Sequence, residues 1–246
     1  MKKAIQTRTT ALIGTALLAV LSSTSLPAGN LLIDPGFELQ TPADQGGWMI
    51  FYGEWFLDGV AHSGNWSMAS SGYYSVAGCF EQFPAAPGSK WRLTGYGMAP
   101  FPLQGSDPNG DAPAYGLVQF SFFDIHGNDL GTVETQGAQY PAKLSNTVDP
   151  STPANEWVFL DTDVATAPEG TAYIQAFTIY VEFSGAFWDQ GVLFDDLDLE
   201  IVNANHGQYV SSIAHNADQL KKAGLITAPQ AAAMVETAAK SAGGKK

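Results

Sequence analysis

Three carboxylates lie close together near residue 195, in the stretch VLFDDLDLEI (192–201). Asp195 and Asp196 are adjacent, and Asp198 follows two positions later. Adjacent carboxylates repel each other unless a cation offsets their charge. Calcium prefers about six to eight oxygen ligands and accepts a mixture of carboxylates and carbonyls. The stretch is therefore a candidate cation site. The alternative is that these acids are solvated positions that alternate with leucines.

The residues that most often carry out catalysis form no recognised pattern. His62, His126, His206 and His215 do not fall in HExxH or a comparable metal motif, and there is no GxSxG element. Cys79 is the only cysteine and is expected to be a small buried hydrophobe. A carboxylate pair for glycoside hydrolysis is defined by its separation in space, so the sequence leaves that reaction open. We nevertheless expect a protein that is not an enzyme.

The charge is unevenly distributed along the 246 residues. Residues 30–202 contain three basic residues against 22 acidic ones, a net charge of −19. Residues 203–246 contain five lysines against two acids, a net charge of +3. Nucleic acid is an unlikely partner for the acidic part, because phosphate binding depends on Lys and Arg. An acidic surface suits cations, including calcium.

The first 29 residues have the pattern of a secretory signal peptide. Lys2, Lys3 and Arg8 precede an apolar run from Ala11 to Leu21, and a stretch of small residues follows it. The run has about 11 residues, whereas a membrane-spanning helix needs roughly 20. No later stretch is long and apolar enough to cross a bilayer. We therefore expect a secreted protein, extracellular or periplasmic, with no transmembrane segment.

Residues 30–202 have the pattern of an all-β domain, and residues 203–246 do not. Short apolar or alternating runs are bounded by Gly, Pro, Asn and Asp. Many short strands without interleaved helices favour a β-sandwich or jelly roll. The expected strands lie at 91–98, 115–125, 157–164, 172–183 and 192–202, with a turn in 124–131.

Beyond residue 203 the pattern changes to that of a helical hairpin, which covers roughly residues 208–241. Apolar residues recur at helical spacing in two runs, separated by Gly224 at a helix-ending position. Thr227 and Gln230 resemble a capping box for the second helix. This hairpin either caps the β-domain or docks on another protein or on the cell envelope.

Five stretches follow one another in a fixed order along residues 30–202. They are NLLIDPGFE (30–38), HSGNWSM (62–68), CFEQFPAAPGSKWRLTGYGM (79–98), EWVFLDTDVATAPEG (156–170) and VLFDDLDLEI (192–201). In this order they resemble the jelly-roll carbohydrate-binding modules of families 4, 9, 16 and 22, part of the galactose-binding-like group. The resemblance covers about residues 30–202 and implies a jelly-roll β-sandwich whose first strand pairs beside its last.

The resemblance also implies a structural calcium ion between the first and last strands. The Glu that follows Phe in the family pattern is Glu38 here, and it supplies a carboxylate. Carbonyls come from the region of Ser63 and Asn65, and Asp195 or Asp196 closes the site. Such an ion would tie the N-terminal segment to the last strand.

Sugar binding, which the resemblance also implies, requires aromatic faces with polar side chains beside them. The best candidates for exposed platforms are Trp48, Tyr52 and Trp55 in the Gly-rich stretch GGWMIFYGEW and Trp188 in GAFWDQG, with Gln190 as a hydrogen-bonding neighbour. We assign Trp91 and Trp157 to the interior. The sequence leaves open whether a sugar binds in a concave groove or at the loop tips.

The leading function is non-catalytic binding of a polysaccharide or glycan through a calcium-stabilised jelly roll. The first alternative is a secreted or envelope interaction protein with the same fold and no sugar ligand. The second is a jelly-roll enzyme that degrades polysaccharides. The C-terminal hairpin is a further candidate contact for a protein partner.

Overall fold

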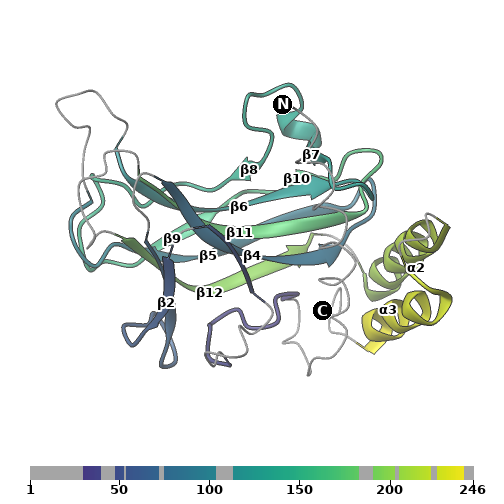
Figure 1. Cartoon of the computed structure of the whole chain (residues 1–246), viewed down its shortest axis with the longest axis horizontal. Helices are drawn as coiled ribbons and strands as arrows, with labels where there is room; N and C mark the ends of the chain where they lie inside the picture. The colour runs from purple at the N-terminus through teal and green to yellow at the C-terminus, as the bar shows by residue number, and fades with distance from the viewer. Residues whose placement is uncertain are drawn as a thin grey trace, which may run out of the picture.

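The computed structural model is a sandwich of two antiparallel sheets with a helical hairpin at one end (Figure 1). It describes residues 30–39, 48–52, 54–71, 75–103, 113–182, 191–202, 205–222 and 226–240. The predicted signal peptide, 1–29, lies outside these residues. No helix in the described ranges has the length and apolarity needed to span a membrane.

The first sheet has the strand order β1-β4-β11-β6-β7, and β8 also pairs with β6. The long strands β4, β6 and β11 pair along almost their whole length. The strands of the first sheet are β1 (Met49–Tyr52), β4 (Ser75–Pro84), β6 (Tyr115–Phe123), β7 (Asp129–Gly131), β8 (Lys143–Leu144) and β11 (Tyr173–Glu182).

The second sheet has the order β10-β5-β12-β3-β2, and β9 also pairs with β5. A short 3₁₀ turn, Val133–Thr135, lies between β7 and β8. The strands of the second sheet are β2 (Glu54–Asp58), β3 (Ser67–Ser71), β5 (Lys90–Met98), β9 (Val158–Asp161), β10 (Ala165–Thr166) and β12 (Gly191–Ile201).

The core fills the space between the two sheets. Alternation sends every second residue inward, so Phe120 and Phe122 of β6 face Trp91 and Leu93 of β5 in one buried cluster. Trp91 is 1% exposed, as predicted, and Cys79 is buried in the same cluster. Trp157, which we assigned to the interior, is only partly buried.

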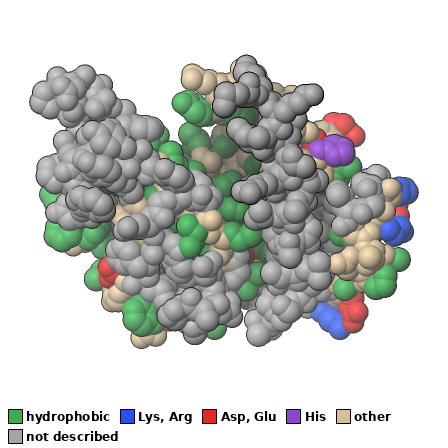
Figure 2. Space-filling model, in the orientation of Figure 1, with side chains coloured by type: hydrophobic (Ala, Val, Ile, Leu, Met, Phe, Trp, Pro, Cys, Tyr) green, Lys and Arg blue, Asp and Glu red, His purple; other side chains and the backbone are tan. Residues whose placement is uncertain are grey.

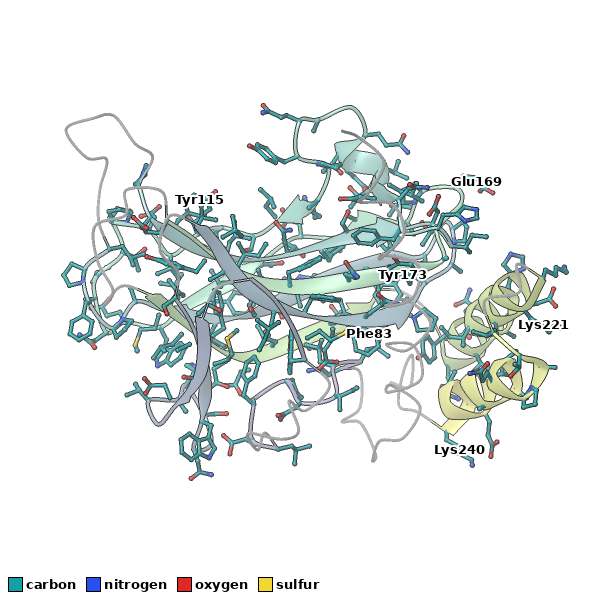
Figure 3. The ribbon with its side chains drawn as sticks, in the orientation of Figure 1. Phe83, Tyr115, Glu169, Tyr173, Lys221 and Lys240 are labelled. Carbon is teal, nitrogen blue, oxygen red and sulfur yellow. The ribbon has the colours of Figure 1, made fainter. Side chains whose placement is uncertain are left out.

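The C-terminal hairpin consists of α2 (His206–Lys222) and α3 (Ala228–Lys240). Its apolar face joins the main core through Tyr209, Ile213 and Ala217, so the helices are packed on the sandwich beside β4. Figure 3 shows Lys221 on the side of the hairpin away from the sheets and Lys240 below α3. The predicted capping box is present, since the Thr227 amide donates to Gln230 Oε1 at 2.7 Å.

The edge of β9 is covered by one side chain. Asn146 Nδ2 donates to the Phe159 carbonyl at 2.9 Å, and Asn146 Oδ1 accepts from the Asp161 amide at 3.0 Å. The amide thus replaces the two hydrogen bonds that a neighbouring strand would make, and it blocks edge-to-edge pairing at this point.

Candidate functional site

The N-terminal segment, residues 30–38, lies along the last strand, as the resemblance implied. The Leu31 amide donates to the Leu199 carbonyl at 3.0 Å, and the Leu197 amide donates to the Pro35 carbonyl at 2.9 Å. The buried Asp34 carboxylate then accepts hydrogen bonds from the amides of Glu38 and Leu39. These contacts fix a tight turn that presents the Glu38 side chain beside β12.

Glu38 binds one half of the loop that connects β2 to β3. Its Oε1 accepts from the amides of Asn65 and Trp66 at 2.6 and 2.9 Å, and its Oε2 accepts from Asn65 Nδ2 at 3.1 Å. Burial acts to raise the pKa of Glu38, but these three hydrogen bonds lower it below its usual value. Glu38 is therefore ionised at neutral pH.

Asp195 and Asp196 bind the other half of the same loop. Asp195 Oδ2 accepts from the amides of His62 and Ser63 at 2.7 and 3.1 Å. Asp196 accepts from Ser63 Oγ at 2.7 Å, and its second oxygen lies 2.7 Å from His62 Nδ1. The His62 ring stacks on Tyr96 with centroids 3.7 Å apart, so this half of the loop is anchored on β5 as well as β12.

The backbone is irregular where these carboxylates meet. Asp196 has φ of 47° and Phe37 has φ of 56°, a region that L-residues seldom occupy. The pairing of β12 with β5 shifts register between Asp195 and Asp198. Strained residues of this kind often occur at functional sites, and here they turn both Asp195 and Asp196 toward the loop.

Gly36 lies beside the two aspartate carboxylates and the stem of the Glu38 side chain. A Cβ atom at Gly36 would lie 3.6 Å from Asp195 Oδ1, 3.8 Å from Asp196 Oδ1 and 3.8 Å from Glu38 Cγ. The structure thus brings together all five residues that the sequence suggested for a metal site: Glu38, Ser63, Asn65, Asp195 and Asp196.

Carboxylate oxygens, which calcium prefers, lie on both sides of the loop: those of Asp195 and Asp196 on one side and those of Glu38 on the other. No Lys or Arg in the described part of the chain forms an ion pair with them. Burial, with the charge of Asp196, raises the pKa of Asp195 although three backbone amides act to lower it. No cluster of three or more His, Cys, Asp or Glu side chains that could hold a metal occurs among the described residues.

Of the predicted sugar platforms, the structure places the side chain of Trp48 and the backbone of Tyr52 and Trp55. Trp48 is 3% exposed, its Nε1 donates to the Asp34 carbonyl at 3.0 Å, and its ring packs on Phe37. It is therefore a core residue, and its assignment as an exposed platform was wrong. Tyr52 pairs with Gly78 in the first sheet, whereas Trp55 pairs with Ser70 in the second. Trp188 and Gln190 lie outside the described residues.

The outer face of the first sheet carries a second apolar cluster, separate from the core. Leu117, Ile179 and Val181 are buried in it, with Tyr115 and Phe177 packed against them. Figure 2 shows hydrophobic side chains near the middle of the view, where Figure 1 draws β4, β6 and β11. Tyr115 and Tyr173 lie toward opposite ends of this sheet (Figure 3).

Aromatic rings and amides alternate along this outer face. Phe80 and Phe177 are paired across β4 and β11 with ring centroids 5.3 Å apart. Gln175 Nε2 donates to Gln82 Oε1 at 3.0 Å one row away. Gln119 pairs with Phe177 on the other side of β11. We name Phe80, Gln82, Gln119, Gln175 and Phe177 the aromatic–amide rows.

Sequence reasoning missed most of these rows. The signal was present in QFSFF and YIQAFTIYV, where both alternating sets of positions contain large apolar residues. A strand with two apolar faces indicates either burial on both sides or a face that is used for binding.

The comparisons with known proteins concern the fold. No family model and no curated protein matches the chain. The solved structures that it resembles include the xylan-binding CBM22-1 domain of Paenibacillus barcinonensis Xyn10C, with 17% identity and a TM-score of 0.45 over 73% of this chain and 99% of that chain. They also include the C-terminal family 22 module of Clostridium thermocellum Xyn10B, with 14% identity and a TM-score of 0.47 over 73% of this chain and 98% of that one.

Another similar structure is the enzymatically active domain of tailspike protein 4 from bacteriophage CBA120. It is 11% identical, with a TM-score of 0.46, over 70% of this chain and only 21% of the tailspike chain. Carbohydrate-binding modules of family 16 are among the similar structures as well. Carbohydrate-binding modules of families 16 and 22, two of the families named in the predicted resemblance, are thus among the solved structures to which this chain is similar.

Proposed function

We propose that this chain binds a polysaccharide or other glycan without cleaving it, on the outer face of the first sheet. The observation that supports this proposal is the set of aromatic–amide rows on β4, β6 and β11. The C–H face of a sugar ring packs on an aromatic face, and its hydroxyls bond to planar polar side chains such as amides.

The composition of the rows favours binding over hydrolysis. The described outward positions of β4, β6 and β11 that surround Phe177 carry amides, hydroxyls and apolar groups, and none of them carries a carboxylate. Hydrolysis of a glycosidic bond usually requires two carboxyl groups on either side of it. The absence of such a pair from these rows supports a binding role.

Two tyrosines extend the rows toward the rim of the face. Tyr115 begins β6, and burial raises its pKa, with a further contribution from the nearby Tyr140. Tyr140 is 72% exposed. An exposed ring beside a half-buried one suits the edge of a sugar-binding face, because it offers contact area at a low cost in conformational entropy.

Glycan binding is tested by presenting the whole chain to a glycan array and to insoluble polysaccharides. We expect retention on at least one polysaccharide and release by a soluble oligosaccharide of the same linkage. Bovine serum albumin serves as the control for non-specific retention. The absence of binding to every glycan would contradict the proposal.

We further propose a structural calcium ion held by Glu38, Asp195 and Asp196 with carbonyls from the loop around Ser63 and Asn65. Calcium would supply positive charge beside the adjacent carboxylates of Asp195 and Asp196, with Glu38 on the other half of the same loop. The residues of the chain already order the loop by hydrogen bonding, so the ion would add to the stability of the junction between residues 30–38 and β12.

Chelation is therefore expected to destabilise the protein. An ion that binds only the folded state adds about 3 kcal/mol when its concentration is roughly 100 times the Kd. The midpoint of thermal unfolding should fall on addition of EDTA and recover with excess calcium. In Glu38→Gln, which keeps the shape but loses the charge, the response to calcium should be much smaller. Identical midpoints with and without EDTA in the native chain would contradict the calcium proposal.

We also propose that the protein is secreted after removal of residues 1–29, and that the C-terminal hairpin offers a contact for a protein partner. The charge pattern at the start of the sequence supports secretion. The net positive charge of residues 203–246, next to an acidic β-domain, supports a contact between the hairpin and a protein partner.

A further inference from the structure

Three large apolar side chains are exposed together at the loop end of the sandwich, outside the aromatic–amide rows. Trp66 is 42% exposed, Val60 is 51% exposed and Leu39 is 57% exposed. Trp48 and Trp91, by contrast, are 3% and 1% exposed. No other aromatic ring in the described part of the chain stacks on Trp66.

Hydrogen bonds that involve these residues or their chain neighbours hold the three segments close together. The Trp66 amide donates to Glu38 Oε1 at 2.9 Å, and Leu39 is the residue that follows Glu38. Ser67 Oγ, adjacent to Trp66, donates to the Val60 carbonyl at 2.7 Å. We name Leu39, Val60 and Trp66 the loop-end patch.

The loop that carries Trp66 is held rigidly before any ligand arrives. Four of its backbone amides, those of His62, Ser63, Asn65 and Trp66, donate to the carboxylates of Asp195 and Glu38. A ligand that packs on a preorganised ring does not have to supply the free energy for ordering the loop. An exposed Trp on such a loop is therefore well suited to binding.

The polar surroundings of the patch narrow the class of ligand. Asn65 and the Glu38 carboxylate lie beside Trp66, and residues 30–89 contain no Lys or Arg. An anionic membrane, a phosphate group or a uronic acid would be repelled by such a surface. A neutral sugar ring offers a C–H face to the indole and hydroxyl donors to the carboxylate and amide oxygens.

We propose that Trp66 is the platform of a second glycan site, at the loop end of the sandwich, whose ligand is a neutral sugar. The site is distinct from the aromatic–amide rows, because Trp66 immediately precedes β3 of the second sheet. It rests on the proposed function in that the chain must bind glycans. Two sites in different parts of the sandwich allow one molecule to contact two glycan segments.

The test is isothermal titration of the whole chain with xylohexaose, cellohexaose and mannohexaose in the presence of calcium. The native chain should bind two molecules of the effective hexaose. Trp66→Ala should bind one hexaose molecule under the same conditions, because the affinity of the loop-end site should fall by about tenfold or more. Trp66→Phe, which keeps an aromatic face, should still bind the second hexaose molecule, with reduced affinity. Equal unfolding midpoints for the variants and the native chain show that the loop remains folded.

Phe177→Ala separates this proposal from the proposed function. If Phe177→Ala removes all binding and Trp66→Ala removes none, the loop-end site is wrong and the sheet site stands. If the native chain binds no glycan, both are wrong. Binding to vesicles of phosphatidylcholine and phosphatidylserine that is lost in Trp66→Ala would assign the patch to lipid and overturn the sugar site.

Discussion

Replacing Asp195 with alanine is expected to lower the free energy of unfolding by about 4 kcal/mol. The Asp195 side chain is fully buried and accepts hydrogen bonds from the amides of His62, Ser63 and Asp196. Each buried donor left without an acceptor costs roughly 1–3 kcal/mol. Because 1 kcal/mol shifts the midpoint by roughly 2–4 °C in a domain of this size, a fall of about 10 °C is expected in thermal unfolding.

Asp196→Ala is the matched control, since it removes the neighbouring carboxylate. The side chain of Asp196 is 32% exposed, so water can replace its contacts with His62 and Ser63, and the loss should be near 1 kcal/mol. Both variants should be measured in EDTA as well, because the hydrogen bonds to Asp195 do not require a metal. If both variants lost a similar free energy of unfolding in EDTA, the hydrogen bonds from the buried amides to Asp195 would not stabilise the protein as proposed.

Glu81 is expected to make the protein less stable as the pH rises from about 4.5 to about 8. Burial raises the pKa of Glu81 from 4.5 to about 8, although amide hydrogen bonds from Ile33 and Asp34 oppose the rise. The folded protein therefore holds a proton that the unfolded chain releases above pH 4.5. The stabilisation is complete below that pH and is lost as pH approaches 8, by on the order of 5 kcal/mol.

Glu81→Gln should remove this pH dependence. The free energy of unfolding of the variant minus that of the native chain should rise steadily between pH 5 and pH 8, because the amide does not titrate. Glu81 Oε1 has no hydrogen-bond partner among the described residues, so the neutral amide adds a cost that is constant with pH. Parallel curves for the two proteins, measured by urea unfolding, would show that Glu81 is ionised in the folded state.

Much of the fold was predictable because alternation and turn residues determine strands locally. The strand expected at 91–98 is β5 (Lys90–Met98), and that expected at 192–202 is β12 (Gly191–Ile201). The turn after β6 is present where Asp124 accepts from the amides of His126 and Asn128. The helical hairpin was predictable from the spacing of its apolar residues and from Thr227, which caps the N-terminus of the second helix.

The candidate site was predictable only where residues are tied to a short motif. Glu38, Ser63, Asn65, Asp195 and Asp196 lie in stretches with a recognisable order, and the structure brings them together. Trp48 could not be placed in the same way, because its burial depends on a contact with the Asp34 carbonyl 14 positions earlier. The pairing of Phe80 with Phe177 depends on the register of strands almost 100 residues apart, which no local pattern contains.

Glycan binding by the outer face of the first sheet is tested most directly with two matched variants, Phe177→Ala and Phe159→Ala. Phe159 is 48% exposed and pairs with Tyr96 in the second sheet, so its replacement removes a similar ring from a different face. The measurement is retention on the insoluble polysaccharide that binds the native chain most strongly. Affinity should fall by about tenfold or more in Phe177→Ala and stay unchanged in Phe159→Ala. Equal retention of both variants and the native chain would contradict a glycan site on this face.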